Sequence, residues 1–210
     1  ENSIINNNYA YYGGGLYVFN TNNGVRINGN LVVNNESYSY GGGLYLYYSD
    51  LIFSNNTVGN NKTTYSTSGY GSGMTILYGL PTVRNSIVYH NQGTSGNSNI
   101  YALSLTASAI EYCCIEGGYS GTGNISTSPL FNYIPAVDGY KAEGIVGYDW
   151  TLKDLSPCID AGTGSISGLS LLSYDILDKT RVFNSRIDIG AFETKSYITV
   201  CGTVSSNTIW

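Results

Sequence analysis

The sequence predicts an all-β chain folded as a parallel β-helix, a solenoid of about four to five coils with a loop-rich closing segment. Two segments, Tyr12 to Val18 (YGGGLYV) and Tyr40 to Leu46 (YGGGLYL), are copies of one unit about 28 residues apart. A period of this size is typical of repeats that bury their apolar residues by stacking on one another. Asn and Gly separate the units, and both tolerate the left-handed backbone of tight turns.

The strands follow from short alternations of apolar residues. No window shows a sustained helical stripe, and the stretches are too short and too rich in Gly, Asn and Tyr for helices. We therefore expect about three short strands per coil. An antiparallel sandwich is the alternative, but it does not require neighbouring strands to repeat in sequence. The apolar pairs that repeat are Leu16/Val18, Leu44/Leu46, Met74/Ile76 and Ile100/Ala102.

Stacked coils place equivalent residues in columns, and successive residues of a strand face opposite sides. Asn30 and Asn56 share a turn position where their amides can bond from coil to coil. Arg84 and Glu111 share an outward column, which predicts a surface ion pair of small energetic value. Val32, Val58, Val88 and Ile115 are equivalent positions of successive units. The predicted inward columns are Ile27/Phe53/Val83/Ile110 and Leu16/Leu44/Met74/Ile100, and the outward columns are Tyr17/Tyr45/Thr75/Tyr101 and Phe19/Tyr47/Leu77/Leu103.

The chain resembles a group of secreted bacterial proteins. Phe53 to Val58 (FSNNTV) and the two GGGLY segments are similar to the FxxN and GGA[ILV] repeats of bacterial polymorphic outer-membrane proteins. Ser128 to Phe131 (SPLF), Ser156 to Gly162 (SPCIDAG) and Asp188 to Glu193 (DIGAFE) resemble, in order and spacing, the segment that closes the β-helix of "choice-of-anchor Q" proteins. The resemblance implies a right-handed β-helix located outside the cell or on its surface. It implies no single activity, because fold and function separate.

Three regions are expected: coils over residues 1–130, a closing or capping segment over 131–194, and a terminal strand or the start of a following module over 195–210. Tyr197 to Val200 alternate like one more strand, and Ile4-Ile5 stand at an end without a polar cap. Exposed strand edges invite pairing with another chain. We therefore expect that this chain is either excised from a longer solenoid or associates end to end with other copies.

The amino-acid composition argues against a nucleic-acid partner and against a transmembrane segment. Charged residues make up 11% of the 210-residue chain, the net charge is −5, and 21 residues are Tyr. The nine Lys and Arg residues are scattered and form no basic face, so we expect no nucleic-acid partner. No apolar run approaches the roughly 20 residues that span a bilayer, so no transmembrane segment is expected.

The cysteines leave two interpretations open. Cys158 stands where the resembling segment usually has alanine, and in an oxidising compartment it could pair with Cys113 or Cys114. Adjacent cysteines on a strand face opposite ways, so only one of the two could reach it. Alternatively, all are small buried apolar residues. No cysteine and histidine cluster has metal-ligand spacing, and His90 is interpreted as a turn residue in place of Asn.

Acidic residues gather near the C-terminus. Asp175, Asp178 and Asp188 could ligate Ca²⁺, a hard ion that takes several carboxylate and carbonyl oxygens. Alternatively, Arg181 or Arg186 bridges Asp188 and Glu193 and fixes the loop that caps the core. Apart from this possible Ca²⁺, no cofactor is expected.

The outward tyrosines are the main functional feature of the sequence. Tyr17, Tyr45, Tyr47 and Tyr101 would form an amphipathic strip able to stack on sugar rings or on another protein surface. The same column could equally serve to stabilise the β-helix. Glycosidases use two carboxylates on one cleft, and the repeats offer no such pair. We therefore expect a non-catalytic structural or adhesive β-solenoid, as a module of a surface protein or a fibre subunit, rather than a polysaccharide lyase, glycosidase or polysaccharide-binding module.

Overall fold

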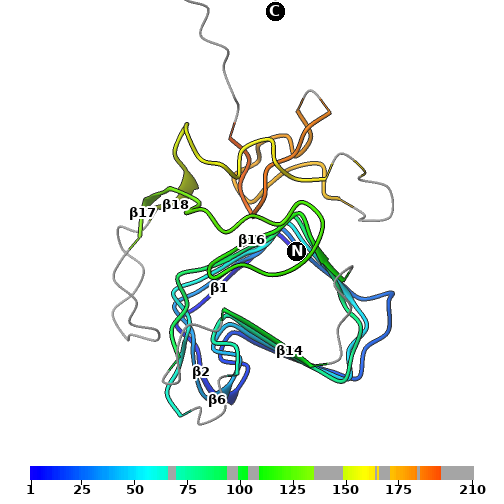
Figure 1. Cartoon of the computed structure of the whole chain (residues 1–210), viewed down its shortest axis with the longest axis vertical. Coiled ribbons are helices and arrows are strands. Elements are labelled where there is room, and N and C mark those ends of the chain that lie inside the picture. The colour runs from blue at the N-terminus through cyan, green and yellow to red at the C-terminus, as the bar shows by residue number, and fades with distance from the viewer. Residues whose placement is uncertain are drawn as a thin grey trace, which may run out of the picture.

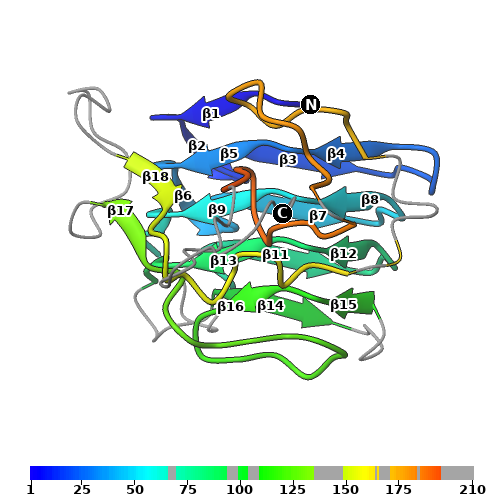
Figure 2. The same ribbon diagram turned by 90° about the horizontal axis from the view of Figure 1, so that it is seen from above.

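The computed structural model describes residues 1–65, 70–93, 99–103, 109–134, 149–163, 165, 171–183 and 185–194. These residues contain no helix, and their parallel strands stack into a solenoid of about four turns. Figure 1 looks along the stack, and Figure 2 shows the successive turns side by side. The predicted fold class is confirmed.

The strands form four parallel sheets, which we call A to D, and a complete turn supplies one strand to each sheet. A turn thus has four strands where three were expected. Sheet B is the exception, because only three turns contribute a strand to it. The unexpected strands form sheet B, which stands out as a lobe in Figure 1. Sheet A contains β1 (Ile4–Asn6), β5 (Leu31–Val33), β9 (Thr57–Gly59), β13 (Ile87–Tyr89) and β16 (Cys114–Ile115). Sheet B contains β2 (Tyr9–Tyr12), β6 (Glu36–Tyr40) and β10 (Lys62–Thr63). Sheet C contains β3 (Leu16–Phe19), β7 (Leu44–Tyr47), β11 (Met74–Leu77) and β14 (Ile100–Leu103), and sheet D contains β4 (Arg26–Asn28), β8 (Ile52–Ser54), β12 (Thr82–Arg84) and β15 (Ile110–Glu111).

The chain turns its corners at residues with left-handed backbone. Asn34, Asn60 and His90 occupy one corner in successive turns, with φ of 57°, 51° and 63°. The interpretation of His90 as a substitute for a turn Asn is therefore confirmed. Gly13 and Gly41 form another corner, with φ of 57° and 58°. These residue types adopt this conformation at the least steric cost, which explains the Asn and Gly between the strands.

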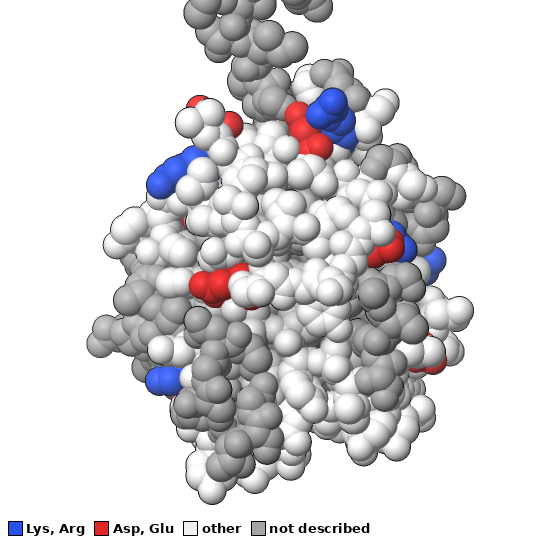
Figure 3. Space-filling view, in the orientation of Figure 1, with Lys and Arg blue, Asp and Glu red and all other residues white. Residues whose placement is uncertain are grey.

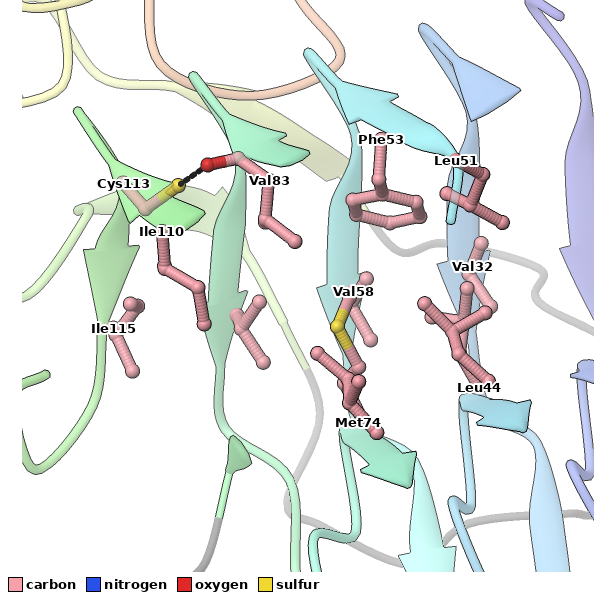
Figure 4. Close-up of a cluster of buried hydrophobic side chains, with 13 residues drawn as sticks. Val32, Leu44, Leu51, Phe53, Val58, Met74, Val83, Ile110, Cys113 and Ile115 are labelled. Atoms are coloured by element: carbon pink, nitrogen blue, oxygen red, sulfur yellow. Dashed lines mark hydrogen bonds between the residues drawn. The ribbon is translucent and has the colours of Figure 1, made fainter. Parts of the chain in front are cut away.

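The interior of the solenoid is one apolar core built from columns of stacked side chains, as the alternation of apolar residues predicts. Phe53 pairs in register with Ile27 on one side and Val83 on the other, and Val83 pairs with Ile110. Phe53, Val83 and Ile110 are fully buried, and Figure 4 shows their side chains lying in a row with those of the other inward columns. The Leu16/Leu44/Met74/Ile100 column is confirmed in the same way. The predicted ion pair of Arg84 with Glu111 is also present.

Buried asparagine amides tie one turn to the next. The Asn30 side chain donates to Asn56 Oδ1 at 2.9 Å, which confirms the predicted ladder. A second ladder runs from Asn35 to Asn61 at 3.0 Å and on to Asn91 at 2.9 Å. These buried amides also donate to backbone carbonyls, so their polar groups are satisfied. Each such bond contributes about 1 kcal/mol net, and an unmade one in the interior would cost more.

The closing segment does not lie where a terminal cap would. The described residues between Phe131 and Thr194 pack sideways on the outer face of sheet A, as Figures 1 and 2 show. Here β17 (Phe131–Tyr133) and β18 (Asp149–Leu152) pair antiparallel. The expectation that this segment caps the open core is therefore wrong. The physical reason is that sheet A has a second apolar face to cover, which includes Leu31, Val33, Ile87 and Cys114.

The last turn is closed by the loop that follows β16. Tyr119 packs against the core, and the Asn124 side chain accepts from Cys113 N at 2.9 Å while donating to the Ile110 carbonyl at 2.9 Å. At the other end, Ile5, Leu16 and Ile27 of the first turn are only partly buried. The residues expected to form a further strand, Tyr197 to Val200, lie outside the described residues.

Candidate functional site

An array of aromatic rings covers the outer surfaces of sheets B and C. We call this array the aromatic face. Sheet C strands carry no Asp, Glu, Lys or Arg, since their sequences are LYVF, LYLY, MTIL and IYAL. The aromatic face comprises Tyr11, Tyr12, Tyr17, Phe19, Tyr38, Tyr40, Tyr45, Tyr47, Tyr48, Tyr65, Tyr70, Tyr78 and Tyr101.

The rings stack along the solenoid axis. Tyr17 and Tyr45 lie with centroids 5.1 Å apart and an interplanar angle of 10°, and Tyr38 and Tyr65 lie at 5.0 Å and 10°. This separation follows from the strand spacing of about 4.8 Å in a parallel sheet. Because neighbouring rings cover each other's faces, the stacks present mainly ring edges to solvent. The surface is therefore a regular array of apolar edges and phenol oxygens.

The stacks of the two sheets are joined into one surface. Tyr40 of sheet B lies 5.5 Å from Tyr45 of sheet C, ring centroid to ring centroid. Where the column of sheet C carries Thr75 in place of a ring, Tyr70 stands edge-on to both Tyr40 and Tyr101, at 4.3 and 4.8 Å. Every ring in this region thus contacts at least one other, which limits its rotamer freedom.

Three of the four predicted binding tyrosines lie on the accessible surface, and one does not. Tyr17 is 50% exposed, and Tyr47 and Tyr101 are half-buried. Tyr45 is only 6% exposed, because rings from both sheets surround it. Burial, followed by the neighbouring Tyr17, raises the pKa of Tyr45 well above its usual range. Tyr45 is therefore a support for the aromatic face and not a contact residue.

Sequence reasoning missed the ladder on sheet B. Tyr11 and Tyr38 stack at 5.0 Å, and Tyr12 and Tyr40 at 5.2 Å. The available signal was the recurrence of tyrosines before each GGG segment, in YAYYGGG and YSYGGG. This signal was hard to use because β2 and β6 are out of step by one residue, so the Tyr positions do not align at a fixed interval.

Two tyrosines of the aromatic face adopt a strained backbone. Tyr48 and Tyr78 follow β7 and β11 with φ of 50° and 55°, and they stack on each other at 5.2 Å. The equivalent residue of the first turn is Asn20, with φ of 53°. A bulky side chain in this conformation costs roughly 1–2 kcal/mol, whereas Asn is tolerated. Tyrosine at two successive corners is therefore unfavourable for stability.

The acidic residues of the closing segment form a buried hydrogen-bonded network and not an assembled metal site. Asp175 accepts from the backbone N–H groups of Leu177, Lys179 and Glu193. Asp188 accepts from Asp160 N at 2.8 Å and Thr194 N at 2.6 Å. Among the described residues, no three His, Cys, Asp or Glu side chains gather in a way that could hold a metal ion. The structure therefore does not bring Asp175, Asp178 and Asp188 together as the predicted Ca²⁺ ligands.

Arg181 organises this network through Glu193, one of the two acids that the alternative interpretation gave it, and the loop that it fixes covers sheet A instead of capping the core. It is 1% exposed, and its guanidinium donates to Glu193 Oε1 at 3.1 Å and to the Gly190 and Ala191 carbonyls. Arg186 is exposed. Arg181 thus holds together the DIGAFE segment, in which Gly190 N donates to the carbonyl of Asn85, at the corner between β12 and β13, at 2.8 Å.

The buried acidic residues of this network should make the free energy of unfolding fall as pH rises. Burial raises the pKa of Asp188 to about 6, and burial followed by the neighbouring Asp188 carboxylate raises the pKa of Glu193 to about 8. The folded state thus keeps protons that the unfolded chain has lost. The contribution of Asp188 and Glu193 to the free energy of unfolding is therefore complete below pH of about 4, the pKa of these groups in the unfolded chain, and it is lost as pH rises through about 8. We expect the free energy of unfolding in urea to decrease between pH 5 and pH 9, and Glu193→Gln to flatten that slope. A slope unchanged in Glu193→Gln would contradict this assignment.

Comparison with known proteins finds no matching family model, curated protein or solved structure. The resemblance to choice-of-anchor Q proteins therefore stays a hypothesis that rests on the motifs. Within the described part of the chain, no helix is long and apolar enough to cross a membrane.

Proposed function

We propose that this chain is a non-catalytic, extracellular adhesive β-solenoid that binds neutral polysaccharide through the aromatic face. The observation that carries the proposal is the fusion of two stacked aromatic ladders into one surface, in which the strands of sheet C carry no charged residue. The motifs that resemble those of secreted bacterial proteins support a location outside the cell or on its surface. The low charge content, apparent as few coloured atoms on the face drawn in Figure 3, supports the same location.

Rigidity favours a binding role. Tyrosine offers large amphipathic contact area with few rotatable bonds, and ordering such side chains is part of the cost of binding. On the aromatic face this ordering is already done, because neighbouring rings hold one another in stacks. Sugar hydroxyls can form hydrogen bonds with the phenol groups, and their oxygens complement the electropositive ring edges. The lack of charged residues on sheet C suits a neutral glycan better than an acidic or basic one.

The strained corners also support contact with a ligand. If the rings served stability alone, Asn would be the better residue at positions 48 and 78, as it is at Asn20. Strained backbone that persists is often found at functional positions. Tyr48 and Tyr78 are each 50% exposed, so their rings are available to a ligand.

A catalytic role has less support. Among the described carboxyl groups, those of Asp188 and Glu193 have raised pKa values. Both are buried and accept hydrogen bonds from backbone N–H groups. Glu111 faces Arg84, and Glu116 accepts from the backbone N–H of His90 and the side chain of Asn99. These groups are occupied in holding the fold, and none lies on the strands of sheet C.

The double variant Tyr48→Asn/Tyr78→Asn separates binding from stability. We expect it to keep its thermal stability, because relief of backbone strain offsets the lost ring stacking. Affinity for a neutral polysaccharide should fall about tenfold or more, since exposed aromatic anchors commonly contribute 1–2 kcal/mol each. The measurement is depletion from solution by insoluble cellulose and chitin, with calorimetry on soluble β-glucan and xylan, at matched Tm.

The matched control is Tyr133→Asn/Tyr174→Asn. These tyrosines are 59% and 55% exposed but lie on β17 and in the closing segment, away from the aromatic face. The control should bind as the unmodified chain does. Retention by none of the four polysaccharides, or equal binding by both double variants, would contradict the proposal. Loss of self-association in the first variant alone would identify other copies of the chain as the partner instead.

A further inference from the structure

Cys114 and Cys158 meet in the interface between the solenoid and the closing segment. Cys114 lies on β16, the last strand of sheet A, and Cys158 belongs to the SPCIDAG segment. Both are fully buried in the cluster that joins sheet A to the closing segment. The two thiols interact with each other within this cluster, and the Cys114 thiol also donates to the Thr127 carbonyl at 3.3 Å. The fold thus brings together two thiols that lie far apart in sequence.

The neighbouring Cys113 points the other way. Its side chain belongs to the interior cluster of the coils, beside Val83 as Figure 4 shows. The thiol donates to the Glu111 carbonyl at 3.2 Å. Strand alternation therefore decides between the two partners that the sequence left open for Cys158.

Cys158 is held in place by its backbone. Its N–H donates to Ser156 Oγ at 3.2 Å, and its carbonyl accepts from Ile189 N at 2.9 Å. The Ser156 hydroxyl donates in turn to the Pro129 carbonyl at 2.6 Å. On the solenoid side, Cys114 N donates to the Ser86 carbonyl at 3.0 Å. Both partners thus stand on anchored backbone, so pairing needs little further ordering.

We propose that Cys114 and Cys158 form an intrachain disulfide that fastens the closing segment to sheet A. The three described cysteines are free thiols in this structure, which therefore represents the reduced form. The disulfide belongs to an oxidising environment, which is the location proposed above for this chain. In a reducing environment the same pair remains two buried thiols that pack as small apolar residues.

The oxidation proceeds by exchange with a low-molecular-weight disulfide such as oxidised glutathione. One protein thiolate attacks a sulfur of that disulfide, forms a mixed disulfide and releases one glutathione thiol. The second protein thiolate then attacks the protein sulfur of the mixed disulfide and releases the second glutathione. Two protein thiols are oxidised, one glutathione disulfide is reduced to two thiols, and two protons leave with the products.

Burial determines when the bond forms. Contact with Cys158 and burial both raise the pKa of the Cys114 thiol, so docked Cys114 holds little thiolate, the reactive species. Exchange should therefore be fast while the closing segment is undocked and slow once it has packed. The fully folded reduced protein should resist glutathione disulfide for much longer than the refolding chain.

The test is a peptide map of the full chain refolded in a mixture of reduced and oxidised glutathione. Cys201 lies outside the described residues, so the map is made both on the natural sequence and on Cys201→Ser. We expect a linked pair of peptides that contain Cys114 and Cys158, and alkylation of Cys113 alone in the Cys201→Ser chain. Because the map uses no change at the paired positions, it does not depend on whether their variants fold.

Thermal unfolding supplies the second readout. Adding a reductant should lower the Tm of the Cys201→Ser chain and of its Cys113→Ser derivative by several degrees. The same reductant should not change the Tm of the Cys158→Ala derivative, which has the alanine usual in the resembling segment. Free thiols at both Cys114 and Cys158 after oxidising refolding, a Cys113 to Cys158 link, or a Tm insensitive to reductant would each overturn the proposal.

Discussion

Replacing Phe53 with aspartate should prevent the solenoid from folding. Phe53 is fully buried in the second turn, between Ile27 and Val83 in the same column. The variant would place an unpaired carboxylate in a dry apolar interior and also leave a large cavity. An unpaired buried charge costs several kcal/mol or more, and removal of a buried Phe costs about 3–5 kcal/mol. These losses together approach the 5–15 kcal/mol that typically stabilises a whole domain.

The measurement is far-UV circular dichroism with size-exclusion chromatography and limited proteolysis. The matched control is Ile52→Asp, one residue earlier on β8, where the side chain faces outward and pairs in register with Arg26. The control should fold, since its charge lies at the surface beside an opposite charge. A soluble, folded Phe53→Asp variant with unchanged Tm would contradict the inward column.

The register of the parallel strands could be predicted from the alignment of the sequence repeats. Residues that stack in a solenoid occupy equivalent positions in successive units, so the alignment of units gives the pairing directly. The Val32/Val58/Val88 column follows this alignment without error, although the third unit is longer than the second. The extra residues lie between β10 and β11 in sequence, and these two strands keep their register with β6 and β7.

The closing segment could not be placed in the same way. It has no repeat, and its position depends on contacts between residues far apart in sequence, such as Ala191 N with Thr57 Oγ1 at 3.0 Å. The sequence did contain one usable signal. Leu31, Val33 and Ile87 are apolar residues at outward positions of sheet A, flanking the inward column. A sheet that is apolar on both faces needs a cover, and the closing segment supplies it.

The sequence predicts the stacked tyrosines of sheet C, but it does not predict that the tyrosines of sheet B extend the same surface. The Tyr17/Tyr45 column appears in the repeat, but its burial depends on the rings of sheet B. Those strands are not apparent from alternation, because β2 and β6 have the sequences YAYY and ESYSY and bury few apolar residues. Only the fold shows that their tyrosines contact the first column, so that Tyr45 becomes a support and Tyr12 and Tyr40 become part of the surface.

Loss of the Arg181 guanidinium should detach the closing segment. Arg181→Met keeps an unbranched side chain of similar length, but it leaves Glu193 buried without its partner and the Gly190 and Ala191 carbonyls without a donor. At pH 9, above the pKa of about 8 of Glu193, this pair is ionised, and breaking a buried ion pair from one side costs about 3–5 kcal/mol. We expect a loss of this size in the free energy of unfolding, measured in urea by tryptophan fluorescence, since Trp150 lies in the interface with sheet A.

Two further variants show whether the loss comes from the pair. Arg186→Met removes an exposed arginine from the same segment and should change stability by less than about 0.5 kcal/mol. Arg181→Met/Glu193→Gln removes both charges, so the penalty of a lone buried carboxylate is absent and part of the stability should return. A loss in Arg181→Met no larger than in Arg186→Met would mean that the segment is held by its apolar contacts alone. In that case Trp150, Phe192 and Ile189, packed on Leu31, Val33 and Ile87, would be the principal attachment.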